Sequence, residues 1–319
     1  MGIKNLNRYL LDHCSENAIQ KIHISTLKYK TVVIDTSIYL YRFTSENALI
    51  ENMYLFISIL LFYKITPIFI FDGKPPIEKN ELLEKRRIYK KEAESKCSEL
   101  LQKLEAETSF MKRQEYRIEI DKLKKQFVRI RLTDIQKVKE LMNAFGVLYY
   151  ESFGEADQLC SYFMKTQQAW GCISDDMDMF LYEGSNRILR NFSLMNHSIV
   201  LYDKYAILNE LNMDELHFRE IMVLCGTDYN VNATYNLYDV IKLHSEFNNN
   251  NCNNDFYDWL TQNTPIIINR DELNRVYNMF TIENGMLNMC KNVVIKPIIT
   301  DNLKIHSIMK NEGFIFINT

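Results

Sequence analysis

The chain of 319 residues is 47% hydrophobic and 25% charged, which excludes fibrous, collagen-like and wholly disordered proteins. Its net charge is −3, so a nucleic-acid partner would have to be bound by a local basic patch rather than by the chain as a whole. No apolar run approaches the ~18–20 residues that cross a bilayer, and we identify no signal peptide. Seven cysteines without a C-x-x-C pair favour a reducing compartment over disulfides or zinc. We expect an intracellular protein of the nucleus or cytoplasm, without a membrane partner.

The first two predicted strands are short apolar runs that end in an acid, residues 32–34 before Asp35 and 68–71 before Asp72. Runs that are apolar on both faces are typical of parallel strands covered by helices. Residues 47–63 suit the crossover helix, and strands at 148–150 and 171–174 flank a helix at 155–166. A hairpin of residues 188–192 and 198–202 is expected at the sheet's edge. The alternation predicts an α/β fold with a mainly parallel central sheet and flanking helices.

Residues 79–131 interrupt this alternation with a charged segment that has neither Pro nor Gly. The segment has 16 basic and 10 acidic residues, whereas the rest of the chain has 22 basic and 31 acidic residues. One interpretation is a solvated helical hairpin with intrahelical ion pairs. The other is a basic insertion that holds a polyanion above an acidic site.

The C-terminal part is predicted to be mainly helical, with an amphipathic helix at 214–225 and two further helices at 271–280 and 301–310 that begin at acids suited to capping. Between the first two, the Asn-rich tract of residues 247–254 is typical of a polar surface loop.

Seven carboxylates lie where predicted strands end or helices begin. They are Asp35, Asp72, Glu155, Asp157, Asp176, Asp178 and Asp228. Most would converge at the carboxyl edge of the sheet, where open α/β sheets bind ligands. Crowded carboxylates repel one another, and a hard divalent cation such as Mg²⁺ or Mn²⁺ relieves that repulsion. Each acid alone also has a structural explanation as a turn residue, a helix cap or part of a polar loop.

Several motifs resemble the flap endonuclease and XPG-type family of structure-specific 5′ nucleases. Met1-Gly-Ile-Lys-Asn-Leu6, Val33-Ile-Asp-Thr-Ser37 and Ile70-Phe-Asp-Gly-Lys-Pro-Pro76 resemble its N-terminal block. Gly154-Glu-Ala-Asp157, Ser174-Asp-Asp-Met-Asp178 and Cys225-Gly-Thr-Asp-Tyr229 resemble its internal block. The motifs keep the family's order over residues 1 to about 230, and residues 298–314 resemble the helical segment that closes the family's nuclease core.

The resemblance implies that the seven carboxylates hold two Mg²⁺ ions, which Mn²⁺ can replace, for phosphodiester hydrolysis. Asp157 stands where the family commonly has Glu, so its shorter arm would shift a ligand without removing it. Residues 79–131 would form the family's helical arch, in which Lys79 and Arg86 contact the scissile phosphate as catalytic residues.

The resemblance also implies DNA contacts from Gly2, Tyr41, Lys74, Lys85 and Arg87. Tyr41 matches an aromatic residue that stacks on the terminal base, an interaction worth about 1–3 kcal/mol. The alternative for Tyr41 is a core tyrosine on the helix after the first strand.

Two departures from the family bear on the substrate. Residues 228–244 contain no glycine after Asp228, whereas the family's helix–hairpin–helix has a Gly-x-Gly turn that binds the DNA backbone and potassium. Residues 56–62 lack the arginines with which the family grips duplex DNA.

We expect one integrated nuclease domain with a PIN-like core. It would comprise an N-terminal block (1–78), the arch (79–131), an internal block (132–245) and a helical closing segment (246–319). The expected activity is Mg²⁺-dependent endonuclease and 5′–3′ exonuclease cleavage of flap, branched or nicked DNA in replication, recombination or repair.

Two alternatives remain open, a ribonuclease of the same superfamily and an inert nucleic-acid-binding protein. We expect a monomer without a sliding-clamp peptide. The compact, Asn-rich chain also suggests a large DNA virus, in which case the protein would act at the viral replication site.

Overall fold

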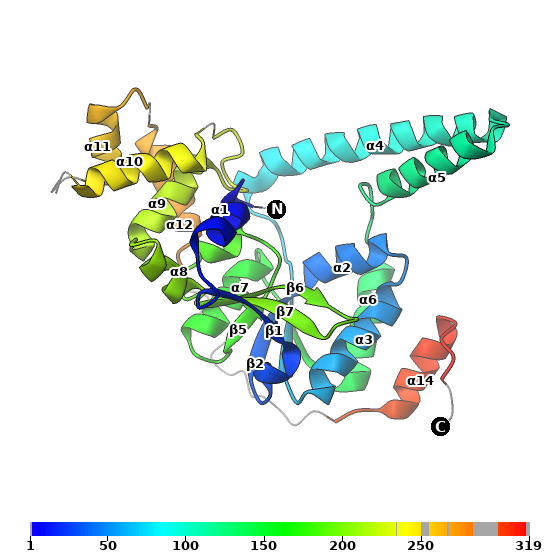
Figure 1. Ribbon diagram of the computed structural model, residues 1–319. Helices are drawn as coiled ribbons and strands as arrows, with labels where there is room; N and C mark the ends of the chain where they lie inside the picture. Colours follow the sequence, from blue (N-terminus) through cyan, green and yellow to red (C-terminus); the bar gives the residue numbers. More distant parts are fainter. Residues whose placement is uncertain (1, 234, 250–254, 267, 283–298, 317–319) are drawn as a thin grey trace.

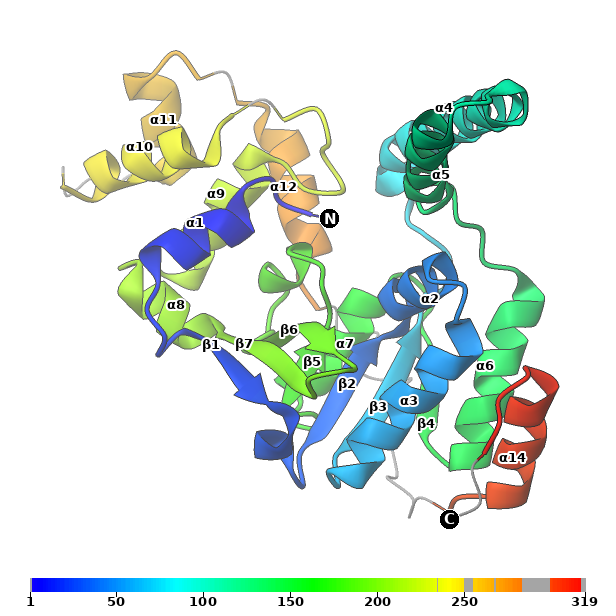
Figure 2. The ribbon, with the colours of Figure 1, turned by 45° about the vertical axis from the view of Figure 1, so that its right-hand side comes forward.

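The computed structural model describes residues 2–233, 235–249, 255–266, 268–282 and 299–316. A seven-stranded sheet with the order β1-β7-β6-β5-β2-β3-β4 forms the centre of this described part (Figures 1 and 2). Strands β6, β5, β2, β3 and β4 are parallel, which confirms the predicted α/β class. The strands are β1 (Ile19–His23), β2 (Thr31–Asp35), β3 (Thr66–Phe71), β4 (Leu148–Glu151), β5 (Gly171–Ile173), β6 (Arg187–Ser193) and β7 (Ser198–Asp203).

The predicted hairpin exists as β6 and β7, but its expected position at the edge of the sheet is wrong. Strand β1 pairs antiparallel with β7, from Ile19 opposite Tyr202 to His23 opposite Ser198, and so forms that edge. The sequence of β1 has only two apolar residues, Ile19 and Ile22, too few for a clear strand pattern.

Helices cover both faces of the sheet, which explains why its central strands are apolar on both sides. Along β2, Val33 joins one hydrophobic core, while Val32 and Ile34 join the other. One face packs against α2 (Thr36–Ser45), α3 (Leu49–Phe62), α6 (Leu132–Phe145) and α14 (Asn302–Asn311). The other core is built with α1 (Leu6–His13), α7 (Ala156–Lys165), α8 (Lys204–Glu210), α9 (Glu215–Cys225), α10 (Leu237–Asn249), α11 (Phe256–Asn263) and α12 (Arg270–Met279).

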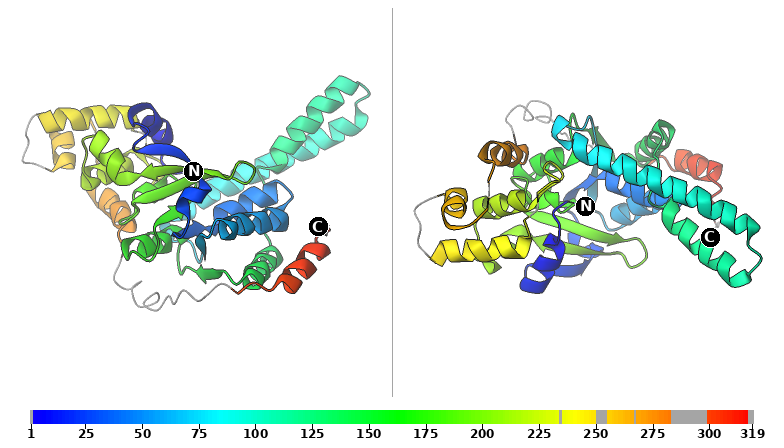
Figure 3. Two further views of the ribbon diagram at one scale, coloured as in Figure 1. Left: turned by 60° about the horizontal axis from the view of Figure 1, so that its bottom comes forward. Right: turned by 90° about the horizontal axis from the view of Figure 1, so that it is seen from above.

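The charged insertion contains a long hairpin of α4 (Asn80–Ala106) and α5 (Phe110–Lys124) that projects away from the sheet (Figures 1 and 3). Its small core consists of Ala93, Cys97, Leu100, Ile120 and Leu123. Exposed ion pairs also connect the two helices, such as Lys96 of α4 with Glu119 of α5 at 3.1 Å. The outer part of the hairpin therefore fits the solvated interpretation, whereas its base reaches the acidic edge of the sheet.

The loop predicted over residues 247–254 is wrong at its start, because α10 continues to Asn249 and buries Phe247 against α11. Residues 250–254 and residue 298 lie outside the described part. The helices predicted at 271–280 and 301–310 are α12 and α14, and Asp301 caps α14 by accepting a bond from the Lys304 amide. Within the described ranges, every helix is too short or too polar to cross a membrane.

Gly73 brings the loop after β3 against the loop after β4. The Gly73 amide donates a 2.7 Å hydrogen bond to the Gly154 carbonyl. A Cβ at Gly73 would lie 1.9 Å from the backbone oxygen of Ser152, which is closer than any non-bonded contact allows. The adjoining acids, Asp72 and Glu155, are therefore positioned by a close backbone contact that only glycine permits.

We predict that Gly73→Ala lowers the free energy of unfolding by about 1–3 kcal/mol, because the two loops must separate to admit the methyl group. Gly154→Ala is the matched control, since its Cβ would meet nothing closer than 3.6 Å. Urea unfolding of both variants measures the difference. Equal stability of the two variants would contradict the prediction.

Candidate active site

The predicted carboxylates gather at the carboxyl edge of the parallel strands, beneath the base of α4. A cavity of about 450 Å³ is lined there by Asp35, Asp72, Glu155, Asp157, Asp176 and Asp228. The seventh, Asp178, is buried behind this lining, and its Oδ2 accepts a 3.0 Å hydrogen bond from the Asp228 amide. The structure therefore brings together all seven acids identified in the sequence.

Local hydrogen bonds fix the carboxylates that follow β2 and β3. Asp35 ends β2, and its Oδ2 accepts a 3.2 Å bond from the Ser174 hydroxyl. Asp72 follows β3, and its Oδ1 accepts a 2.8 Å bond from the Ala156 amide, in the first turn of α7. Asp72 thus caps a helix from another element, which combines a structural role with its place in the cavity lining.

Three of the remaining aspartates, Asp176, Asp178 and Asp228, form a hydrogen-bonded relay along the chain. The Asp178 amide donates to Asp176 Oδ1 at 3.1 Å, and the Asp228 amide donates to Asp178 Oδ2. Gly2, with a φ of +78°, lies against this relay, because a Cβ there would be 2.5 Å from the Oδ1 atoms of Asp176 and Asp178. The close approach requires glycine at position 2, and the predicted DNA contact of Gly2 stays a prediction.

Burial raises the pKa of four carboxylates above the usual Asp value, and the charge of neighbouring carboxylates raises it further. The four are Asp35, Asp157, Asp176 and Asp178. Asp157 Oδ1 and Asp178 Oδ1 are buried and accept no hydrogen bond from the described residues. The cluster therefore holds more negative charge than its protein partners neutralise.

Two cations at the base of α4 face this charge. Lys79 Nζ donates to Glu155 and lies 3.5 Å from Asp228 Oδ2, and Arg86 Nη2 donates to the same oxygen at 2.9 Å. Burial alone would lower the pKa of Lys79, but Glu155 and Asp228 raise it above its usual value. The predicted catalytic cations are thus next to the predicted metal ligands.

The other predicted DNA contacts differ in position. Tyr41 lines the cavity with 47% of its surface exposed, so the core-tyrosine alternative is wrong, and the buried neighbour is Tyr39. Arg87 also lines the cavity. Lys85 and Lys74 lie outside the lining, and Lys85 Nζ donates to Asn232 Oδ1 at 2.7 Å.

The sequence interpretation missed three side chains at this edge. The Tyr229 hydroxyl donates to Glu155, and Lys90 Nζ lies 5.0 Å from the centre of the Tyr41 ring. The third is Ser174, whose hydroxyl donates to Asp35. Tyr229 and Ser174 lie in motifs that also contain the acids, and this closeness in sequence could have identified them. Nothing in the sequence distinguishes Lys90 from the basic residues around it.

The donor set fits a hard divalent cation, since it consists of carboxylates with two unpartnered buried oxygens. Among the described residues, no three His, Cys, Asp or Glu side chains form a closed ligand set. Mg²⁺ keeps several of its waters and takes few protein ligands, so a wide ring of acids around a cavity suits it better than a tight cage would.

Two family models match the chain, the first reaching into α4 and the second beginning after the α4–α5 hairpin. A model described as the XPG N-terminal domain matches residues 1–93, and one described as the XPG I-region matches residues 146–228. These two ranges contain all seven carboxylates and both cations at the base of α4.

Curated relatives match over most of the chain. The probable RAD2-like endonuclease 076L of Invertebrate iridescent virus 3 is 26% identical over 288 residues, 73% of this chain and 75% of the relative. Flap endonuclease 1 of Sulfolobus acidocaldarius is 30% identical over 243 residues, 67% of this chain and 66% of the relative.

Solved structures share the fold. The catalytic core of Rad2 in complex with DNA substrate aligns with a TM-score of 0.69 at 21% identity, over 98% of this chain and 96% of that one. Flap endonuclease-1 from Methanococcus jannaschii aligns with a TM-score of 0.64 at 22% identity, over 98% and 93% of the two chains.

We predict that Asp178→Asn stabilises the metal-free protein by about 1–3 kcal/mol, because it removes a buried charge whose native pKa is raised. The asparagine keeps the oxygen that accepts the Asp228 amide bond. Thermal unfolding in a chelator measures the effect. Asp121→Asn, on the exposed surface of α5, is the control and is expected to change nothing.

The pH dependence follows from the direction of the shift. A carboxylate with a raised native pKa contributes stability below its unfolded value, which is lost as the pH rises through the native value. The advantage of Asp178→Asn over wild type is therefore expected to grow as the pH rises above about 4, the usual Asp value, and to shrink when Mg²⁺ is added. An advantage that is constant with pH and Mg²⁺ would contradict this account.

Proposed function

The chain belongs to the XPG family of nucleases, and we propose that it hydrolyses phosphodiester bonds in 5′-flap, nicked or branched DNA with two Mg²⁺ ions. The observation that carries this proposal is the cavity ringed by carboxylates beneath the cations of α4. Nucleases of this family are metal-dependent hydrolases. The iridescent-virus relatives support a viral origin.

The carboxylates would hold the ions, six of them from the cavity lining and Asp178 from behind it. Bound ions would lower the pKa of the attacking water and withdraw charge from the leaving oxygen. The protein's own contribution is to fix its acids in place before the substrate arrives, through the Ser174, Ala156 and Asp228 hydrogen bonds.

Lys79 and Arg86 would bind the scissile phosphate. Both are positive and lie at the cavity, and in the protein alone they are paired with carboxylates of the proposed metal site. Cation binding there would release these side chains toward a phosphate. Tyr41, half-exposed beside Lys90, would then stack on a base at the cavity mouth.

Cleavage of a 5′-labelled flap duplex in Mg²⁺ tests the proposal directly. We expect the wild type to cut near the junction and Asp178→Asn to lose most of this activity, because the charge of a proposed metal ligand is removed while the side-chain shape is kept. Cleavage of RNA flaps in place of DNA flaps would assign the ribonuclease alternative. Binding without cleavage of either substrate would contradict the proposal and favour the inert binding protein.

The arch cations give a separate prediction. Lys79→Gln or Arg86→Gln is expected to lower the single-turnover rate constant of cleavage by about 10²–10³, since each removes a positive donor from the reacting phosphate. Lys103→Gln, on the exposed outer part of α4, is the matched control and is expected to keep its activity. Single-turnover cleavage under saturating enzyme measures the effect, and a loss equal to that of the control would argue against a role at the phosphate.

A further inference from the structure

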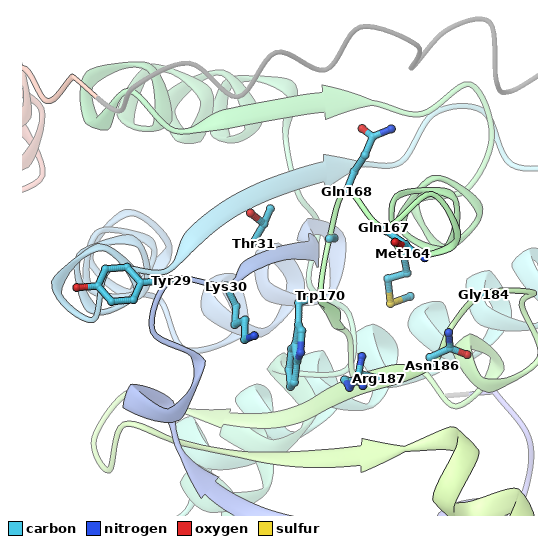
Figure 4. Close-up of a pocket in the computed structure, with 11 residues that line it drawn as sticks. Tyr29, Lys30, Thr31, Met164, Gln167, Gln168, Trp170, Gly184, Asn186 and Arg187 are labelled. Carbon is cyan, nitrogen blue, oxygen red and sulfur yellow. The ribbon is translucent and has the colours of Figure 1, made fainter.

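A second pocket lies at the opposite edge of the sheet, where the parallel strands begin. It has a volume of about 390 Å³. Lys30 precedes β2, Trp170 precedes β5 and Arg187 begins β6, and these three strands are neighbours in the sheet. Figure 4 shows the indole of Trp170 standing between Lys30 and Arg187. Sheet order thus places an aromatic ring between two cations from distant parts of the chain.

The pocket is positive although the chain outside residues 79–131 is acidic. Its described lining contains Lys30 and Arg187 and neither Asp nor Glu. The carboxylate paired with Arg187 is that of Asp203, 3.8 Å from Nε, and both side chains are partly exposed to solvent. Such a loose pair leaves the guanidinium available to an anionic ligand.

Aromatic rings accompany these cations. Arg187 Cζ lies 5.0 Å and Lys30 Nζ 5.9 Å from the centre of the Trp170 ring. At the rim, Tyr29 is 71% exposed, and Lys28 Nζ lies 4.9 Å from the centre of its ring.

The backbone holds Tyr29 in this exposed position. Its φ of +64° is left-handed, which is costly for a bulky residue, and its amide donates to the Lys64 carbonyl at 2.9 Å. Lys64 Nζ in turn lies 5.9 Å from the Tyr29 ring, so the rim presents a ring with a second cation beside it. The side-chain amides of Gln167 and Asn186 add donors and acceptors to the pocket lining.

We propose that this edge binds a segment of single-stranded nucleic acid, with phosphates on Lys30 and Arg187 and a base stacked on Tyr29. Cations combined with exposed rings are the features by which proteins bind single strands without reading their sequence. The volume suits one nucleotide unit and is too small for a duplex. An acidic peptide would use the cations but would offer the exposed ring no base to stack on. The site lies at the sheet edge opposite the carboxylates, so it does not depend on the proposed cleavage.

Intrinsic fluorescence provides a local probe, because the chain has two tryptophans, Trp170 and Trp259. The difference in fluorescence between the wild type and Trp170→Phe gives the emission of Trp170 alone. We expect an oligothymidylate of about ten nucleotides, in a chelator without divalent cations, to change this difference signal in a saturable way. Thymidine 5′-monophosphate is expected to require at least about tenfold higher concentration, because it meets fewer of the contacts.

Lys30→Gln combined with Arg187→Gln tests the phosphate contacts. Loss of two contacts is expected to reduce the slope of log K against log salt by about 1.4, with K taken from the Trp170 signal. Lys304→Gln combined with Lys310→Gln, on α14, removes the same charge elsewhere and is the matched control. Anisotropy of a labelled strand provides a second readout, and both double variants are expected to keep flap cleavage.

Several outcomes would overturn the proposal. The first is that the fluorescence of Trp170 does not change when the oligothymidylate is added. The second is that the mononucleotide, a duplex or an oligoglutamate of matched charge binds as tightly as the oligothymidylate. The third is that the α14 control variant shows the same change in salt slope as the pocket variant. None of these readouts involves cleavage or a metal ion. Failure of this proposal is therefore distinguishable from failure of the proposed nuclease activity.

Discussion

The mutual repulsion of seven carboxylates at one edge of a sheet is the constraint on which the rest of this structure depends. Parallel strands bring their carboxyl ends together, and the helices that cover both faces bury several of the acids that follow them. Protein hydrogen bonds satisfy part of this charge, and Asp157 and Asp178 each retain a buried oxygen without a partner in the described residues. A fold that keeps such a cluster loses stability to do so, which is typical of a functional site.

The hairpin of α4 and α5 is connected to this constraint only at its base. Lys79 and Arg86 lie against Glu155 and Asp228, whereas the outer turns are held by a small core of their own. Cations bound at the proposed metal site would compete with Lys79 and Arg86 for these acids. In the proposed reaction, bound cations would displace Lys79 and Arg86 from the acids, and the two positive side chains would then be free to bind the substrate phosphate.

The sequence predicted the central strands and the acidic edge, because β2 and β3 are apolar on both faces and each leads directly to an acid. It missed β1, whose two apolar residues give no clear period, and it placed Phe247 in a loop although the ring is buried in a helix. The sequence allowed Tyr41 to be either a core residue or an exposed residue that stacks on a base, and only its exposure in the structure excludes the core position. The pocket of Lys30, Trp170 and Arg187 could not have been predicted, because its residues become neighbours only through the order of the strands.

Diffraction from crystals of this protein soaked in Mn²⁺, recorded for the anomalous signal of manganese, tests the central claim most directly. The account predicts anomalous peaks inside the cavity of Asp35, Asp157 and Asp176, with Lys79 moved away from Glu155. Manganese bound only elsewhere on the protein, with Lys79 and Arg86 still paired to the cavity carboxylates, would contradict it.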